Sequence, residues 1–221
     1  MKLLLTSGGI TNQSMRDELF ALAGKSASEL SIAFIPTAAN VETEDKTWLV
    51  KDFVAFESLQ LKLFDIVDIA ALSRDLWQSR LEAVDVLVFG GGHTSYLMQK
   101  IRQSGLADIL PKLLESRVYV GISAGSMVTA PTLLPPGAQL FFYPDETGKH
   151  NEEKGLGFVD FCVRPHLNSP HFPKVINENL EQLAKEFPEP IYAIDDQTAI
   201  SFVNGDIKII TEGEYKVYNQ R

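Results

Sequence analysis

The sequence contains only one cysteine, Cys162, among its 221 residues. This scarcity excludes an internal disulfide framework and fits a reducing compartment. Basic residues are also few, since 20 lysines and arginines stand against 29 acidic residues and leave a formal net charge of −9. Nucleic acids and anionic membranes bind basic surfaces, so we expect neither of them as a partner.

Long apolar segments are absent as well. No stretch approaches the ~20 apolar residues of a membrane span. The run Leu3–Leu5 is followed at once by Thr6-Ser7-Gly8-Gly9, so it is too short for a signal peptide. These features predict a cytoplasmic protein, which we expect to be a monomer or a homodimer. Because the length suits one α/β unit and no composition break marks a linker, we predict a single domain over residues 1–221.

Short apolar runs alternate with segments of helical periodicity through the first half of the chain. Strands are predicted for residues 2–6, 32–35, 61–69, 84–89 and 118–122. This alternation predicts an α/β fold with a mostly parallel sheet and helices on both of its faces.

The second half of the chain is less regular. Residues 131–144 hold four prolines and a glycine, so we predict an irregular segment near the site. Asn204-Gly205 lies between two apolar runs and predicts a C-terminal β-hairpin, because type I′ turns favour this dipeptide. The other elements predicted here are a strand at 158–163, a helix with Pro173 in its first turn, a strand at 191–194 and an edge strand at 215–218.

The most specific motif is Gly121-Ile122-Ser123-Ala124-Gly125, which directly follows an apolar run. This pattern is typical of a nucleophile elbow, where a serine lies on a sharp turn between a strand and a helix. Small neighbours are needed because a side chain at either glycine would collide with adjacent backbone. The alternative is a glycine-rich connection with an incidental serine, since short motifs recur by chance.

A serine nucleophile requires a base, and the chain offers only four histidines: His93, His150, His166 and His171. His166 is favoured because it follows the strand predicted at 158–163, and active sites of open α/β sheets gather at the carboxyl ends of strands. His171 lies five residues further on and is the main alternative, whereas His150 falls in a polar segment.

An acidic residue must orient the base. Asp196 follows the strand predicted at 191–194, with Asp145 as the second candidate and a turn-forming Asp195-Asp196 pair as the alternative interpretation. The backbone amides of Ala124 and of Gly91 or Gly92 are candidates for stabilising an oxyanion. The order serine, histidine, aspartate differs from that of the α/β-hydrolases, in which the acid precedes the histidine.

Three segments together resemble the peptidase E family of serine peptidases, relatives of cyanophycinase: Phe89–Thr94, Gly121–Ser126 and Pro165-His166. The resemblance covers nearly the whole chain. It implies a fold like that of class I glutamine amidotransferases, and hydrolysis of dipeptides with an N-terminal aspartate without metal or cofactor. It also implies that Ser123 is the nucleophile and His166 the base. The third residue lies soon after the elbow in some relatives and at the position of Asp196 in others; this chain has no acid between Ser126 and Pro144, which favours Asp196.

The chain departs from this family pattern at His93, where relatives often have asparagine, and at Arg164, where a neutral residue is usual. Both are candidate substrate-binding residues. Arg164 and His166 are two residues apart on a predicted strand, so we expect them on one face. Arg164 would then pair with a substrate carboxylate, or alternatively form a structural ion pair with a residue such as Asp160. The competing functions are a non-catalytic binding protein of the same fold, or a hydrolase of another amide such as a cyanophycin-like polymer.

Overall fold

A computed structural model describes residues 1–134, 136–143 and 152–220. Its strands are β1 (Lys2–Thr6), β2 (Ser31–Ile35), β3 (Leu63–Ile66), β4 (Val86–Phe89), β5 (Val118–Ile122), β6 (Cys162–Arg164), β7 (Ile191–Ile194), β8 (Thr198–Val203), β9 (Asp206–Thr211) and β10 (Tyr215–Tyr218). Its α-helices are α1 (Gln13–Ala23), α2 (Thr47–Glu57), α3 (Arg74–Glu82), α4 (Thr94–Gln103), α5 (Leu106–Leu113), α6 (Ala124–Met127), α7 (Pro136–Phe142) and α8 (Asn177–Glu186). Two short 3-10 helices are η1 (Ala27–Glu29) and η2 (Thr37–Val41).

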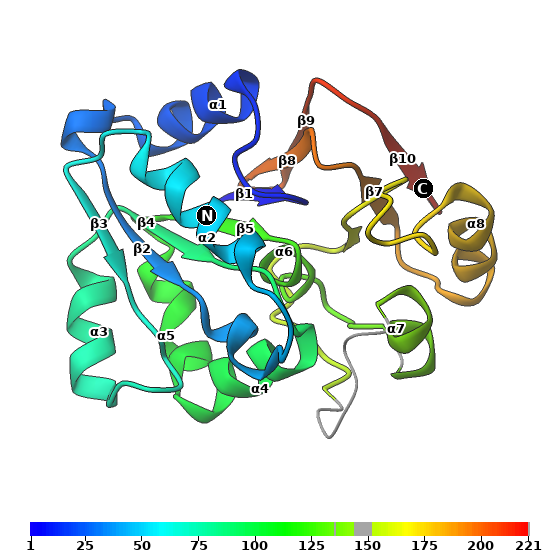
Figure 1. Ribbon diagram of the computed structural model, residues 1–221, viewed down its shortest axis with the longest axis horizontal. Helices are drawn as coiled ribbons and strands as arrows, with labels where there is room; N and C mark the ends of the chain where they lie inside the picture. The colour runs from blue at the N-terminus through cyan, green and yellow to red at the C-terminus, as the bar shows by residue number, and fades with distance from the viewer. Residues whose placement is uncertain (135, 144–151, 221) are drawn as a thin grey trace.

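The main sheet of the described chain has seven strands in the order β3-β2-β4-β5-β1-β8-β9 (Figure 1). The first five of these are parallel, and β8 joins β1 in the antiparallel direction. The predicted α/β fold with a mostly parallel sheet is therefore confirmed. β8 and β9 pair across Asn204-Gly205, where Gly205 has a φ of +107°, so the predicted hairpin is confirmed as well.

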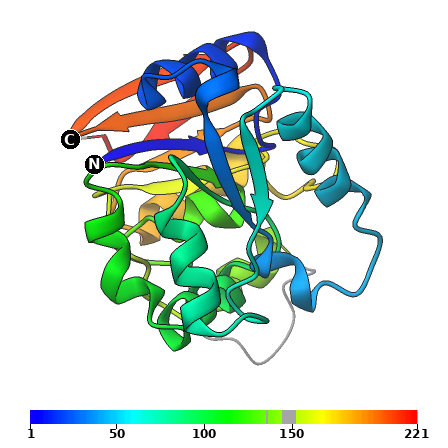
Figure 2. The ribbon, with the colours of Figure 1, turned by 90° about the vertical axis from the view of Figure 1, so that its left-hand side faces the viewer.

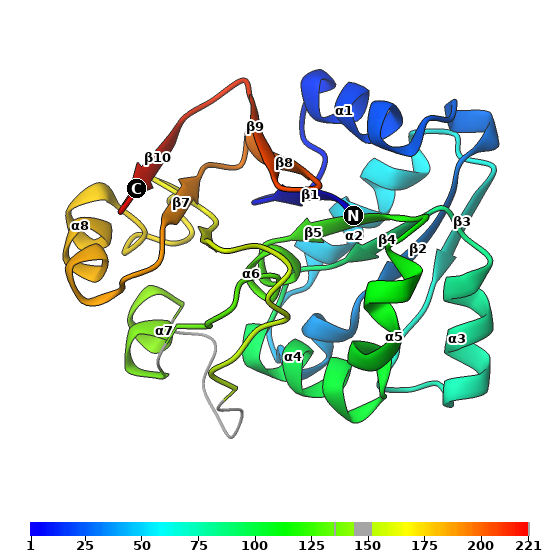
Figure 3. The same ribbon diagram turned by 180° about the vertical axis from the view of Figure 1, so that it is seen from behind.

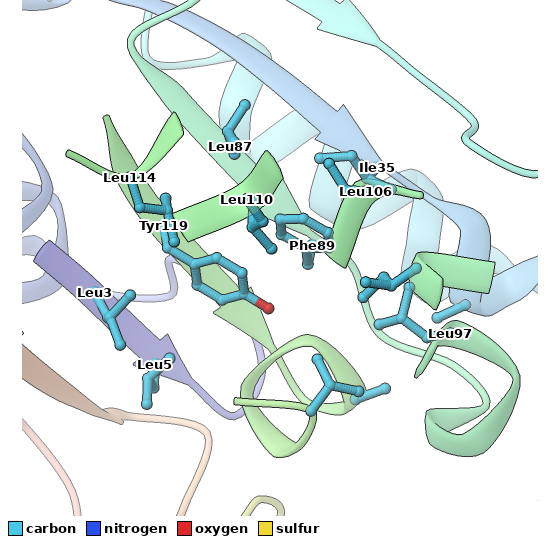
Figure 4. Packing of buried hydrophobic residues seen from close by; sticks show 14 of the residues in the cluster. Leu3, Leu5, Ile35, Leu87, Phe89, Leu97, Leu106, Leu110, Leu114 and Tyr119 are labelled. Atoms are coloured by element: carbon cyan, nitrogen blue, oxygen red, sulfur yellow. The ribbon is translucent and has the colours of Figure 1, made fainter. Parts of the chain in front are cut away.

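Helices cover both faces of the main sheet because alternate strand residues point to opposite sides. On one face, Leu4 of β1 packs with Met15 of α1, in a cluster to which α2 also contributes. On the other face, Leu3 and Leu5 belong to a larger cluster with Leu97 of α4 and with residues of α3 and α5 (Figure 4). Figure 2 shows α1 and α2 across the sheet from α3, α4 and α5. The predicted two-sided cover is confirmed.

A second sheet lies beside the main one, with the strand order β10-β7-β6. It forms one end of the molecule together with α7 and α8, as Figures 1 and 3 show from opposite sides. β6 and β7 are parallel, and β10 pairs with β7 as an edge strand. The strand predicted at 158–163 is thus only Cys162–Arg164, and it does not join the main sheet.

Two predictions about the second half of the chain are wrong. Residues 131–144 were expected to be irregular, but 136–142 form α7, because a proline is tolerated in the first turn of a helix. Pro173 was expected in the first turn of a helix, but α8 begins only at Asn177. None of the helices in the described part of the chain is long and apolar enough to cross a bilayer.

Candidate active site

Ser123 lies on a strained turn between β5 and α6. Its backbone has φ +48° and ψ −108°, a conformation that a residue with a side chain rarely adopts. The two glycines of the motif are required by close contacts. A Cβ on Gly121 would lie 2.6 Å from the backbone nitrogen of Ser126, and one on Gly125 would lie 2.0 Å from the carbonyl oxygen of Phe89. The local geometry is that of a nucleophile elbow.

The end of β1 holds this turn in place. The backbone nitrogen of Ser123 and the hydroxyl of Ser126 both donate to the carbonyl oxygen of Thr6, at 3.1 and 2.7 Å. The Thr6 hydroxyl in turn donates to the carbonyl oxygen of Gly121 at 2.8 Å. In the segment 118–130, every residue except Ser123 is buried. The turn therefore raises one hydroxyl out of an otherwise closed core.

His166 connects Ser123 to Asp196 by hydrogen bonds. The Nε2 atom of His166 is 3.0 Å from the Oγ of Ser123, and its Nδ1 atom is 2.9 Å from the Oδ1 of Asp196. With the Asp196 carboxylate accepting a hydrogen bond from Nδ1–H, the Nε2 atom keeps its lone pair and can accept the proton of the Ser123 hydroxyl. The structure thus brings together the three residues singled out in the sequence, in the arrangement of a Ser-His-Asp triad.

Asp196 is held in its ionised form. Burial opposes ionisation of its carboxyl, but the hydrogen bonds from His166 and Ser7, together with the charges of His166 and His171, outweigh that effect. The pKa of Asp196 therefore lies below its ordinary value. His171 itself is exposed, and the hydrogen bond to Ser123 comes from His166.

Ser7 is a site residue that the sequence interpretation missed. Its hydroxyl donates to the Oδ1 of Asp196 at 2.5 Å and accepts from the backbone nitrogen of His166 at 2.7 Å. The backbone of His166 has a φ of +67°, and Phe172 stacks on its ring with centroids 4.1 Å apart. Ser7 directly follows β1, so the strand-end rule used for Asp196 would have found it.

Three backbone amides near Ser123 are suited to bind an oxyanion. A Cβ on Gly91 would lie 3.5 Å from the Cβ of Ser123, so the glycine loop passes directly beside the nucleophile. Ala124 is the first residue of α6, where backbone amides have no partner within the helix. Within the described residues, no backbone hydrogen bond occupies the amides of Gly91, Gly92 or Ala124. Gly92 has a φ of +122°, and a Cβ there would collide with Ala38.

Comparison with known proteins places the chain in a family. The profile described as Peptidase family S51 matches residues 3–210. The chain belongs to peptidase family S51. Because S51 is a family of serine peptidases, the chain is a peptidase of the serine type, and its resemblance to peptidase E is confirmed.

Relatives of this S51 chain extend over most of its length. An uncharacterised peptidase of Listeria monocytogenes is 30% identical over 184 residues, which cover 82% of this chain and 85% of that protein. Peptidase E of a Nostoc species is 28% identical over 177 residues, and the match covers 78% of this chain and 66% of that protein. The crystal structure of a candidate peptidase E protein from Listeria monocytogenes matches with a TM-score of 0.77 and 26% identity, covering 96% of this chain and 98% of that one.

Two residues expected to bind substrate in this S51 chain are withdrawn from solvent. His93 is 4% exposed and caps α4, its Nδ1 accepting from the backbone nitrogen of Tyr96 at 3.3 Å. Arg164 is 1% exposed, and its guanidinium lies 5.9 Å from the ring centroid of Phe187. The expectation that Arg164 and His166 share a strand face is wrong, because β6 ends at Arg164 and the positive φ of His166 breaks the alternation.

Among the described residues, Arg164 forms no ion pair, with Asp160 or with any other acid, so the structural alternative finds no support there. Its Nη1 donates to the carbonyl oxygen of Val163 at 2.9 Å, while Nε and Nη2 have no hydrogen-bond partner among the described residues. Asp145 and His150, the second candidates for the acid and a possible base, lie outside the described residues.

Proposed function

We propose that this S51 peptidase hydrolyses short peptides through an acyl-enzyme formed on Ser123, with His166 as the base and Asp196 as the orienting acid. The observation that carries the proposal is the continuous hydrogen-bonded path from the Ser123 hydroxyl through both ring nitrogens of His166 to the Asp196 carboxylate. This path ends at a hydroxyl that a strained turn exposes, which is how serine peptidases present an activated nucleophile.

In the first half of the reaction, the Oγ of Ser123 attacks the scissile carbonyl carbon while its proton passes to Nε2 of His166. The amides of Ala124, Gly91 and Gly92 are proposed to receive the oxyanion of the tetrahedral intermediate. When the carbon–nitrogen bond breaks, Nε2 returns the proton to the leaving amine. Ser123 is left as an ester with the acyl part of the peptide.

In the second half, a water molecule attacks that ester and gives its proton to Nε2 of His166. Collapse of the second intermediate returns the proton to Oγ of Ser123 and releases the product as a carboxylic acid, which then loses its proton to water. Asp196 stays ionised throughout, because its lowered pKa keeps it an anion beside the imidazolium that forms twice per turnover.

The finer part of the proposal is that the preferred substrates are dipeptides with an N-terminal aspartate. It is supported by the motif resemblance and by the relatives named peptidase E. Arg164 does not support this preference. The residue is 1% exposed, so its guanidinium could reach a substrate only if the surrounding residues moved. The preference for an N-terminal aspartate is therefore best tested by comparing substrates, and not by changing Arg164.

Two measurements test the proposal. An active-site-directed fluorophosphonate should label the wild-type chain and leave the Ser123→Ala variant unlabelled; absence of labelling would favour a non-catalytic binding protein. A library of dipeptides that differ in the N-terminal residue should then show highest kcat/KM for aspartate. Labelling without dipeptide turnover would indicate another amide, such as a cyanophycin-like polymer.

A further inference from the structure

The first half of α2 lies against the glycine loops that surround Ser123. The ring of Trp48 comes within 3.6 Å of the position that a Cβ on Gly91 would take, and Gly91 borders Ser123 on the other side. One helical turn later, Asp52 lies against Gly9: its Oδ1 is 3.2 Å from the position of a Cβ there. The same Cβ position is 3.6 Å from Ile122, the residue before the nucleophile. Asp52 thus lies against the Gly8-Gly9 segment that follows Ser7, whose hydroxyl binds Asp196 and His166.

Asp52 differs from Asp196 because no partner for its carboxyl is found in the described part of the chain. Gly8 borders Asp196, which is bonded to His166 and Ser7, whereas the next residue, Gly9, borders Asp52. Among the described residues, no hydrogen bond and no ion pair involves the Asp52 carboxyl. Burial alone acts on it and raises its pKa to about 7.

A partly buried carboxyl without donors lowers the stability of the fold, since desolvation is not offset by any contact. Such a group is typical of a site that completes its interactions with a ligand. A cation with several N–H donors would supply the charge and the hydrogen bonds that such a carboxylate accepts. Substrates of short-peptide hydrolases carry one close to the reacting carbon, because the α-amino nitrogen is only two bonds, about 2.5 Å, from the scissile carbonyl carbon of an N-terminal residue.

We propose that Asp52 binds the α-ammonium group of the substrate's N-terminal residue, and so makes the enzyme select peptides with a free amino terminus. This inference rests on the proposed function of Ser123 as nucleophile. The ammonium supplies the charge and the donors that Asp52 lacks, and Trp48 lies one helical turn away on the side of Gly91. Selection therefore acts on the chain end, independently of the side chain that the first residue carries.

The test compares the best dipeptide from the library with its desamino analogue, in which hydrogen replaces the α-amino group. Wild-type enzyme should prefer the free-amino dipeptide. Asp52→Asn keeps the shape of the side chain and removes its charge, so kcat/KM for the free-amino dipeptide should fall about 10- to 100-fold, the scale of a lost charge-assisted hydrogen bond. The fall should lie mainly in KM, because the ammonium is held equally before and during the reaction. The desamino analogue should be unaffected.

Glu57→Gln provides the matched control, since Glu57 is an exposed acid at the end of the same helix. This variant should behave like wild type toward both substrates. Equal losses on both substrates in Asp52→Asn would overturn the inference, and so would unchanged discrimination. A wild-type enzyme that hydrolyses both substrates equally would overturn it without any variant.

The fluorophosphonate separates this inference from the function on which it rests. The reagent carries no ammonium group, so it should label Ser123 at the same rate in wild type and in Asp52→Asn. A wild-type chain that is not labelled contradicts the proposed function. A labelled chain in which Asp52→Asn changes neither KM nor discrimination contradicts only the role of Asp52.

Discussion

Ser7 offers the sharpest test of how the site is held together. It is fully buried, its hydroxyl donates to Asp196, and the same oxygen accepts the backbone N–H of His166. Ser7→Ala removes both interactions and leaves a partly buried amide without a partner. That loss corresponds to about 1–3 kcal/mol of unfolding free energy, or a Tm lower by roughly 2–12 °C for a chain of this size.

The effect of Ser7→Ala on catalysis should be smaller than that of losing Asp196. The bond between a hydroxyl and a carboxylate contributes about 1.5–3 kcal/mol. The side chain of Asp196 is 42% exposed, so a water molecule can partly replace the hydrogen bond that Ser7 donates. About half of that range, roughly 0.75–1.5 kcal/mol, should appear as weaker orientation of His166. We therefore expect kcat to fall about 4- to 12-fold.

Ser201→Ala is the control for this experiment. Ser201 is also a buried serine whose hydroxyl donates to a carboxylate, that of Glu18 at 2.7 Å, and it contacts none of the proposed catalytic residues. Both variants should lower the Tm, measured by thermal unfolding, but only Ser7→Ala should lower kcat in the dipeptide assay. Equal kcat in both variants would show that Ser7 supports the fold alone and would refute the reasoning.

The remaining predictions concern the proposed triad and Asp52. Ser123→Ala should lower kcat by about 10⁶-fold with the circular dichroism spectrum unchanged; near-normal turnover would end the serine mechanism. His166→Ala should cost about as much and the double variant little more, whereas His171→Ala should be mild; the reverse order would exchange their roles. Asp196→Asn should lower kcat by about 10⁴-fold, and an unchanged rate would reopen the question of the acid. Because the pKa of Asp52 is raised to about 7, protonated Asp52 favours the folded state, so stability falls as pH rises from about 4 to 7; Asp52→Asn should remove this fall in urea titrations.

The sequence predicted those elements of the fold that depend on neighbouring residues alone, such as apolar runs and tight turns. Continuous apolar runs in a parallel sheet are buried on both faces, so β1, β2, β4 and β5 were visible in the sequence. The Asn204-Gly205 turn was also visible, because both of its residues have positive φ and this dipeptide is favoured in such turns. What the sequence could not show was partnership between distant segments. β6 is three residues long and pairs with β7, so neither strand by itself indicates a second sheet.

The reason given for His166 was partly wrong although its position near Ser123 was correct. It was expected to follow a strand at 158–163, but the strand is only Cys162–Arg164 and belongs to the second sheet. Within that sheet the strand-end rule still operates. β6 and β7 are parallel, and His166 and Asp196 each lie two residues beyond the end of their strand. Arg164 illustrates the limit of the rule, since strand alternation fails once the backbone leaves the strand.

The segment after β1 has a larger role than its sequence suggests, because its consecutive residues contact different groups of the site. The carbonyl of Thr6 holds the Ser123 turn, and Ser7 binds both Asp196 and His166. Gly8 and Gly9 then give room to Asp196 and Asp52, where a Cβ would come within 3.2 Å of a carboxylate atom in each case. The elbow supplies the nucleophile, but its alignment with the base and the acid depends on this segment. A displacement of its backbone would therefore shift all of these groups together. A side chain at Gly8 or Gly9 would cause such a displacement, because its Cβ would crowd a carboxylate and because Gly9 has a φ of +87°.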